Sequence, residues 1–424
     1  MAQLTDDCFA FSGPLMRLED MERLIEERIA PVAESEAVPL RGARGRVAAA
    51  DVVAPADLPP FDNSAVDGYA VRHADLAPDG DTRLPVAGRL MAGTRAALTL
   101  ESGQAIRIFT GAPMPSGADT VFMQEDVTVD GDAVLLPKGL KLGANRRLAG
   151  EDVPRGQVVL PAGTVLEPQH VALAAALGIT QLNVRRRLRV AIFSTGDEVV
   201  EPGEPRAGAA IYDANRYLLG ELLERLGAEV TDLGILVDEP VALGAALQAA
   251  AAAGHDLIVT SGGVSTGEAD YVRAAVERAG SLVFWRVGIK PGRPVALGVI
   301  RGGAGTSAAF VGLPGNPVAV FVTFVKVVKP LLRRLSGALP QKLTPLPVRS
   351  GFAYRKKKDR REYVRVALRR GADGELEAVK HPQDGAGILT SLTETDGLLE
   401  FPEEVTAIAP GDRVGFLSYP TLIG

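Results

Sequence analysis

The stretch Leu188–Val199, LRVAIFSTGDEV, is an apolar run that ends abruptly in a polar turn containing glycine. A short apolar run bounded by a turn signal is typical of a strand that is buried on both faces. The segments that follow are a helix, a strand, a second helix and a second strand, at Tyr217–Leu226, 228–237, Val241–Ala253 and 256–263. Strands that alternate with helices predict parallel βαβ units and a doubly wound sheet.

The same alternation continues toward the carboxyl end of this region. We expect a helix at Tyr271–Ala279, strands near Leu282–Val287, Val295–Val299 and Ala308–Leu313, and a long helix at Pro317–Leu335. Far upstream, apolar residues recur at helical spacing between Leu18 and Val32, which predicts one amphipathic helix.

The flanking regions have a different pattern. Residues 35 to about 185 contain short β-branched runs cut by Gly, Pro and Asp, so this half is predicted to be mostly β. From Gly337 onward, three closely spaced prolines indicate a linker into a final small β domain that ends at Gly424. Because 424 residues exceed the roughly 250–300 at which one core stops growing, we expect several domains, and the changes of pattern along the chain give at least three.

Composition excludes several classes of protein. A net charge of -6 and a pI near 5.5 disfavour tight non-specific binding to nucleic acid. The single cysteine, Cys8, cannot build a disulfide framework or a thiolate metal cluster within one chain. The sequence shows no basic apolar leader and no apolar run of the roughly 18 residues that a membrane helix needs. We therefore expect a cytoplasmic protein without a membrane segment.

Polar residues follow the predicted strands, at the edge where open α/β sheets bind ligands. Four such turns follow strands, namely STGDE, LVDEP, TSGGVSTGEAD and GLPGNP. A single turn of this kind would be interpreted as a capped βα turn, but four at one sheet edge favour a phosphate- or nucleotide-binding pocket. Glycines there let backbone amides approach an anion, and Asn316 with Pro317 is expected to begin a helix whose amides face it. The candidates are Ser194, Thr195, Asp197, Glu198, Asp238, Ser261, Gly262, Gly263, Ser265, Thr266, Asp270, Asn316 and Pro317.

Two basic segments could complement an anion. Lys290 and Arg293 lie on the Pro- and Gly-spaced segment GIKPGRPVALG, which is either an oxyanion site or a solvated basic turn. The segment RKKKDRREYVRV would suggest a nuclear signal or a nucleic-acid patch, but the acidic chain argues against both. We expect Arg361 on a strand edge, facing a substrate of another domain or subunit.

The candidate site is rich in oxygen ligands and poor in histidine. The four histidines are scattered singly, without the spacing of metal ligands, and structural or surface roles are expected for them. The carboxylates suit a hard cation such as Mg²⁺, and they are Asp67, Asp152, Glu198, Asp238 and Asp270.

Seven segments together resemble the MoeA family, molybdopterin molybdenumtransferases that are akin to the E-domain of gephyrin. They occur in the family's order over almost the entire chain, and they are PPFDNSAVDGYAV, IFTGAPMP, AGEDV, FSTGDEVV, TSGGVSTGEADY, IKPGRP and GLPGNPVA. The resemblance implies a multidomain α/β plus β fold: a doubly wound MogA-like molybdopterin-binding domain, a β-rich two-part N-terminal region and a small C-terminal β-barrel domain. The implied boundaries are 11–34 with 186–336, 35–56 with 142–185, 57–141, and 337–424.

The resemblance also implies site residues and an assembly. It implies a homodimer whose cleft lies between the doubly wound domain of one subunit and the β domain of the other. Asp62 is interpreted as a turn former that bonds nearby backbone. Arg293 replaces the family's more usual Lys, and Arg360 replaces its usual Gly. The residues that match functional positions of the family are Asp67, Thr110, Asp152, Glu198, Asp238, Asp270, Lys290, Arg293, Pro314, Pro317, Arg361 and Ser391.

The activity implied by the resemblance is insertion of molybdate into adenylylated molybdopterin, with hydrolysis of the pyrophosphate bond and release of AMP. Glu198 and Asp270 would hold Mg²⁺, and the implied protein partners are a MogA-like adenylyltransferase and molybdoenzyme chaperones. Three alternatives stay open: a tungstate-preferring paralogue, a non-catalytic dimeric scaffold, and, less favoured, a MogA-like adenylyltransferase that would not need the β half or the last domain.

Overall fold

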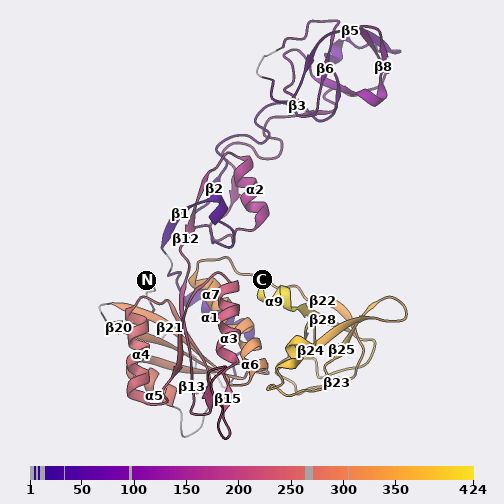
Figure 1. Ribbon diagram of the computed structural model, residues 1–424. Helices are drawn as coiled ribbons and strands as arrows, with labels where there is room; N and C mark the ends of the chain where they lie inside the picture. Colours follow the sequence, from indigo (N-terminus) through magenta and orange to yellow (C-terminus); the bar gives the residue numbers. More distant parts are fainter. Residues whose placement is uncertain are drawn as a thin grey trace.

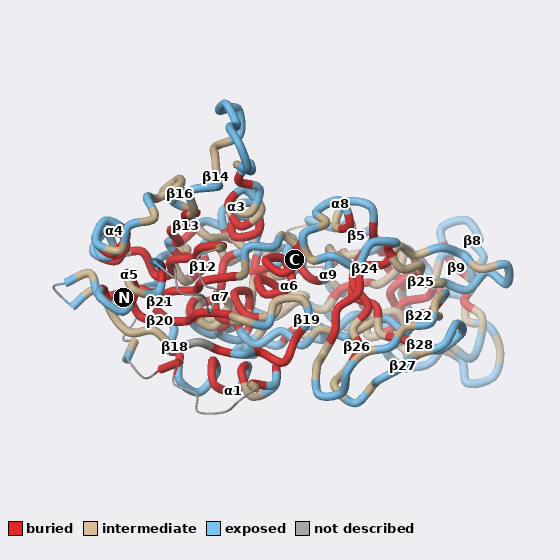
Figure 2. Tube along the Cα trace, turned by 90° about the horizontal axis from the view of Figure 1, so that it is seen from below, coloured by how far each residue is buried: buried red, intermediate tan, exposed pale blue. Residues whose placement is uncertain are grey.

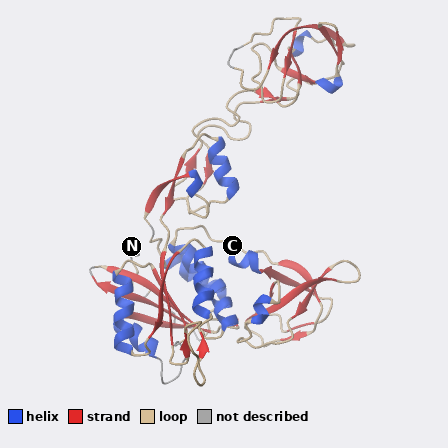
Figure 3. Ribbon diagram, viewed as in Figure 1, coloured by secondary structure: helices blue, strands red, loops and turns tan. Residues whose placement is uncertain are grey.

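The chain folds into a doubly wound domain, a small middle domain, a distal β domain and a C-terminal barrel (Figures 1 and 3). The computed structural model describes residues 4–5, 8–9, 15–32, 34–94, 98–262, 271–303 and 305–424, apart from the side chain of Phe284. Within these residues, no helix has the length and apolar character needed to cross a membrane. The fold confirms the predicted multidomain α/β plus β class.

The doubly wound domain is built on a six-stranded sheet. In spatial order its strands are β16 (Glu229–Leu236), β13 (Arg189–Thr195), β17 (Leu257–Ser261), β21 (Thr306–Leu313), β20 (Pro294–Gly303) and β18 (Gly280–Arg286). The first four are parallel, as predicted, and β18 runs in the same direction, but β20 lies antiparallel to both of its neighbours, β21 and β18. The reason is the connections: β20 passes to β21, and β18 to β20, without a helix, so each strand reverses direction.

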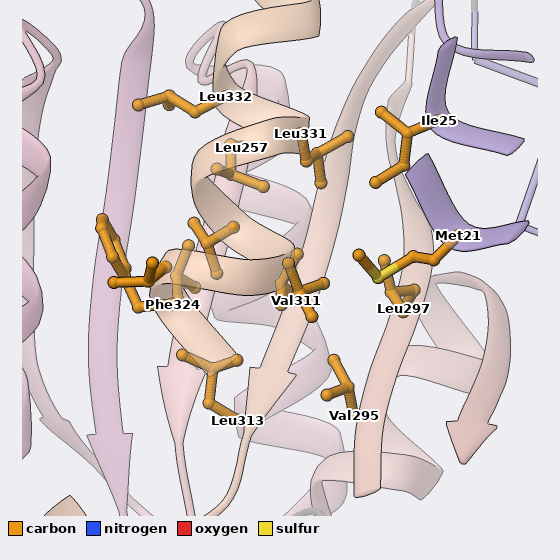
Figure 4. Packing of buried hydrophobic residues seen from close by; sticks show 14 of the residues in the cluster. Met21, Ile25, Leu257, Val295, Leu297, Val311, Leu313, Phe324, Leu331 and Leu332 are labelled. Carbon is orange, nitrogen blue, oxygen red and sulfur yellow. The ribbon is translucent and has the colours of Figure 1, made fainter. Parts of the chain in front are cut away.

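Helices cover both faces of this sheet. One face packs against α1 (Leu18–Arg28), α3 (Asn215–Arg225), α6 (Pro317–Thr323) and α7 (Lys329–Leu335); the other packs against α4 (Pro240–Ala252) and α5 (Tyr271–Ala279). Figure 4 shows Met21 of α1 beside Leu297 of β20, and Ile25 of α1 belongs to the same core. The helix expected from the N-terminal pattern thus completes the core of a domain whose other elements lie far downstream.

The predicted helix Pro317–Leu335 is interrupted. Residues Phe324–Val328 form a π-helical segment between α6 and α7. Pro330 has no N–H to donate to the carbonyl four residues earlier, which favours a wider turn at this point.

The middle domain joins two distant stretches of chain. β1 (Ser35–Pro39) pairs with β12 (Gln181–Arg185), and β2 (Val52–Val53) pairs with β11 (Val158–Leu160). The region also contains a helix, α2 (Pro168–Ala176), that the β pattern did not predict. Pro168 at its first position and the reciprocal bonds between Glu167 and His170 stabilise its start.

The distal domain is a second six-stranded sheet, inserted between the two halves of the middle domain. Its short link is the pair β3 (Asn63–Ser64) and β10 (Arg146–Arg147). The strands lie in the order β7 (Thr120–Met123), β4 (Gly68–Val71), β6 (Ala105–Ile108), β5 (Thr82–Leu90), β9 (Ala133–Leu136) and β8 (Thr128–Asp130). Figure 1 shows this domain at the far end of the molecule from the doubly wound sheet.

The C-terminal domain is a closed five-stranded barrel. Its strands are β24 (Arg361–Arg370), β25 (Leu376–Lys380), β22 (Leu346–Ser350), β28 (Arg413–Ser418) and β26 (Gly397–Phe401), and β26 pairs back onto β24. β19 (Ile289–Lys290) of the doubly wound domain extends this sheet in parallel with β24. Further short elements are β23 (Tyr354–Arg355) with β27 (Ala407–Ile408), β14 (Val199–Val200) with β15 (Ile211–Tyr212), α8 (Thr390–Thr393) and α9 (Tyr419–Ile423).

Candidate functional site

Three parallel strands of the doubly wound sheet end at the same level. Ser194 of β13 is the register partner of Ser261 of β17, and Ser261 is the partner of Leu313 of β21. The N–H of Gly262 donates to the carbonyl of Leu313 at 2.9 Å, so the turns after these strands lie side by side. Both serines are buried, and the Ser194 hydroxyl has no hydrogen-bond partner among the described residues. Gly263, Ser265 and Asp270 lie outside the described residues.

Acidic side chains converge on this edge. The Thr195 hydroxyl donates to Asp238 Oδ1 at 3.1 Å. Burial raises the pKa of Asp238 above its ordinary value, the bond from Thr195 opposes that change, and the negative charges of Asp197 and Glu198 add to it. Crowded carboxylates of this kind favour a cation. Among the described residues no three candidate ligands stand close enough to hold one, so the predicted Mg²⁺ site stays a prediction.

Gly196 lets the carboxylate of Glu198 fold back against the end of β13. Its φ is +131°, and a Cβ built on it would lie 2.7 Å from Glu198 Oε2. A larger residue would therefore be strained and would displace the carboxylate, which explains the glycine in the STGDE turn.

Behind the acidic edge lies a charge network that sequence reasoning did not identify. Arg216 of α3 is 4% exposed and forms ion pairs with Asp213, Asp232 and Glu201. Burial disfavours the cation, but its bonds to Asp232 and Asp213 outweigh burial and raise the pKa of Arg216. The network holds the base of the β14–β15 connection, whose exposed loop projects from the domain in Figure 2. A lone arginine in an acidic segment was the only available signal.

The GLPGNP turn is tied down from two sides. Asn215 Nδ2 of α3 donates to the Gly315 carbonyl at 2.7 Å. The N–H of Val318, in the first turn of α6, donates to the Ala386 carbonyl of the C-terminal domain at 2.9 Å. The expectation that the amides after Asn316 and Pro317 face a ligand is therefore wrong for Val318, because the barrel domain already satisfies its N–H. Pro314 is half-buried in the same turn.

The barrel contributes Arg365 rather than Arg361 to this region. Arg361 is engaged by Glu19, Glu400 and Glu403, at 2.6, 3.5 and 2.9 Å, so its charge is already neutralised. Arg365 Nε donates to the Ser391 hydroxyl at 3.0 Å.

Within the described residues, the hydrogen bonds of Arg365 go to uncharged oxygens and not to a carboxylate. Its Nη2 donates to the carbonyls of Gln383 and Gly385, at 3.0 and 3.1 Å. Gly385 directly precedes Ala386, whose carbonyl accepts from the first turn of α6. Burial lowers the pKa of Arg365, and no carboxylate among the described residues forms an ion pair with it. The ion pairs of Arg361 do not test whether it faces a substrate, which stays a prediction. Ser391 is fully buried and contacts Arg365 instead.

The two cations of the IKPGRP segment differ. Lys290 Nζ lies 3.1 Å from Glu362, its register partner on β24, and the Tyr354 hydroxyl donates to the same carboxylate oxygen at 2.8 Å. Arg293 is exposed. Lys290 thus belongs to both the doubly wound domain and the barrel sheet.

The distal domain carries the second group of predicted residues. The Thr110 N–H and hydroxyl both donate to Asp67 Oδ1, at 2.8 and 2.7 Å, and these bonds lower the pKa of Asp67. The Asp62 carboxylate bonds backbone, as predicted, but the N–H that donates to it, at 2.8 Å, belongs to Ala149, 87 residues further along the chain. It also pairs with Arg146 at 2.6 Å. Asp152 is exposed, and its N–H donates to the Leu58 carbonyl.

The two groups do not meet within one chain. Figure 1 places the distal domain, with Asp67 and Thr110, beyond the middle domain from the sheet edge that carries Glu198 and Asp238. A ligand that touches both groups must therefore bind between two chains.

Fold and site define a multidomain protein with a molybdopterin-binding type of doubly wound domain and a barrel packed against it. Family models match the MoeA N-terminal region (domain I and II) at residues 16–178, a probable molybdopterin binding domain at 191–334, and the MoeA C-terminal region (domain IV) at 347–419. The chain belongs to the MoeA family.

Similar proteins cover nearly the whole chain. A molybdopterin molybdenumtransferase of Haemophilus influenzae is 37% identical over 97% of this chain and 100% of its own. One from Nostoc is 38% identical over 91% of this chain and 89% of its own. A crystal structure of the molybdopterin biosynthesis MoeA protein of Pyrococcus horikoshii OT3 has a TM-score of 0.79 and 31% identity, covering 96% of this chain and 100% of that one.

Proposed function

We propose that this protein is a molybdopterin molybdenumtransferase, which takes adenylylated molybdopterin and molybdate and produces molybdenum cofactor and AMP. The observation that carries the proposal is the sheet edge where β13, β17 and β21 end in register beside Asp238 and Glu198. Relatives with this name match along almost the full chain, which supports the assignment.

The acidic edge suits the pyrophosphate half of the reaction. Glu198 and Asp270 would hold Mg²⁺, which when bound offsets the negative charge of a phosphoanhydride and polarises the phosphorus under attack. Asp238 adds a third carboxylate, oriented by Thr195. The Ser194 and Ser261 side chains lie at the ends of their strands, where hydroxyl donors would orient an oxygen-rich ligand.

The basic groups near α6 suit the oxyanion half. Arg365 is held by Ser391 and by two backbone carbonyls, and Lys290 is held by Glu362, so both cations are oriented before a ligand arrives. Molybdate is a compact dianion that such donors would bind. The role that the resemblance gave to Arg361 therefore passes to Arg365, whereas Arg361 ties the barrel to α1.

A homodimer would bring the separated groups together. In this proposal Asp67 and Thr110 of one subunit complete the sheet edge of the other, since they cannot reach their own. The test mixes two inactive variants, Asp67→Ala and Glu198→Ala. Random assortment makes half the dimers mixed, each with one intact site of two, so about a quarter of the wild-type activity should return. A mixture that stays inactive would contradict a composite site.

The activity itself is tested by AMP release. Protein is incubated with adenylylated molybdopterin, Mg²⁺ and either molybdate or tungstate; Glu198→Ala should abolish release, and Glu221→Ala, an exposed acid on α3 of the same domain, should not. Faster release with tungstate would identify a tungstate-preferring paralogue. No release with either anion would favour a non-catalytic scaffold.

The setting follows from the substrates. A MogA-like adenylyltransferase would supply the adenylylated compound, and molybdoenzyme chaperones would receive the product. We place the protein in the cytoplasm, because a chain with one cysteine has no need of an oxidising compartment.

A further inference from the structure

Two arginines stand side by side on the distal sheet. Arg89 of β5 and Arg107 of β6 are register partners in a parallel pair, so their side chains leave the sheet on the same face. Both guanidinium groups lie over the ring of Phe109, at 4.6 and 5.0 Å from its centroid. Arg107 also lies 4.9 Å from the centroid of Tyr69. The aromatic rings hold the two cations in place.

Neither cation has an ion-pair partner in the part of the chain that the structure describes. Among the described residues, no carboxylate forms an ion pair with Arg89 or Arg107, and Arg107 donates to the uncharged side-chain oxygen of Gln124. The exposed Arg83, on the same strand as Arg89, shows the contrast, because Asp130 pairs with it at 2.7 Å. Like charges directly opposite each other on neighbouring strands are destabilising. Two adjacent arginines without an acidic partner therefore indicate that an anion binds between them.

This pair borders the distal half of the candidate site. Phe109 directly precedes Thr110, whose N–H and hydroxyl hold Asp67. After those two bonds, the positive charge of Arg107 also contributes to the low pKa of Asp67, which places the guanidinium within electrostatic reach of that carboxylate. A ligand that contacts Asp67 therefore meets two oriented guanidinium groups.

We propose that Arg89 and Arg107 form a binding site for a phosphate ester, namely the phosphate groups of an adenylylated substrate. The inference rests on the proposed function and adds to it a substrate contact from the distal domain. Guanidinium groups stacked on an aromatic ring expose their N–H edges, which match phosphate oxygens in pairs. The chemistry is shared by a nucleotide and by free pyrophosphate.

Binding of AMP and of pyrophosphate to the full chain tests the site by calorimetry at fixed ionic strength. The variant Arg89→Gln/Arg107→Gln should weaken AMP binding roughly tenfold or more. The variant Arg89→Lys/Arg107→Lys keeps the charges but loses the paired N–H donors of the guanidinium groups, so its AMP affinity should lie between those of the Gln variant and the wild type. Arg83→Gln is the matched control and should bind as wild type does. Weakening with pyrophosphate alone would make the site one for the free ion and overturn the nucleotide assignment.

Kinetics separate this inference from the proposed function. In AMP release the double Gln variant should raise KM for adenylylated molybdopterin roughly tenfold with kcat within about twofold of wild type. Equal KM and equal AMP affinity in the double Gln variant and in Arg83→Gln would overturn the site while leaving the activity intact. A wild type that releases no AMP, but whose AMP affinity still depends on the arginines, would overturn the activity and leave the site.

Discussion

Replacing Asp256 should selectively destabilise the doubly wound domain. Its carboxylate is 2% exposed and accepts two bonds from Arg186, at 2.7 and 2.8 Å, and one from the Arg189 N–H at 2.9 Å. Asp256→Ala leaves a partly buried cation and a backbone donor without their partner. Breaking a buried pair costs about 3–5 kcal/mol, and because Arg186 keeps 23% exposure we expect about 3 kcal/mol.

The chain offers a probe for this effect. Trp285 is the sole tryptophan in the sequence, and it lies fully buried in the doubly wound domain, so its fluorescence reports the unfolding of that domain. A loss of about 3 kcal/mol corresponds to a midpoint roughly 6–12 °C lower in a domain of this size. The control is Asp130→Ala, which breaks an exposed pair in the distal domain and should move the Trp285 transition by less than about 1 °C. Equal shifts in the two variants would refute the reasoning.

Three further predictions concern the sites. Gly196→Ala should reduce AMP release at least tenfold through strain of about 1–3 kcal/mol and displacement of Glu198, with the Trp285 transition showing that the domain still folds. Thr110→Val should raise the pKa of Asp67 and move the acid limb of the kcat/KM profile to higher pH, whereas Thr110→Ser should not; an unchanged limb in both would contradict the assigned role of the hydroxyl. Burial lowers the pKa of Lys329 from 10.5 to about 8, so the folded state loses that proton at lower pH than the unfolded state does. Between pH 8 and pH 10.5 the unfolding free energy of the wild type should therefore rise by about 3 kcal/mol relative to that of Lys329→Met. Equal pH slopes of the unfolding free energy, measured in urea, would disprove this.

Strands and helices of the doubly wound domain could be predicted because each has its own periodicity. The run in β13 and the glycine stops after α3 and α4 are local signals, and the register that aligns Ser194 with Ser261 follows from parallel pairing. The direction of β20 could not be predicted in this way, because it depends on a connection without a helix.

Partner choice was the part that the sequence could not show. Arg361 and Arg365 lie on the same strand, four residues apart, and only distant partners separate their roles: Glu19 of α1, 342 residues away, for the first and Ser391 for the second. Asp62 likewise finds Arg146 and Ala149 rather than its neighbours. Such contacts depend on tertiary structure, and a motif identifies the residue type without its partner.

The attachment of the barrel bears on how the cleft that we propose between two subunits could open during turnover. β19 is hydrogen-bonded into the barrel sheet and Arg361 reaches α1, so the barrel and the doubly wound domain are expected to move as one body. The distal domain, in contrast, is joined to the middle domain by two connecting segments of chain, next to the short β3–β10 pair. Movement of the distal domain would then limit how fast the pterin enters and the nucleotide leaves. Making its two connecting segments more rigid should therefore slow product release more than the chemical step.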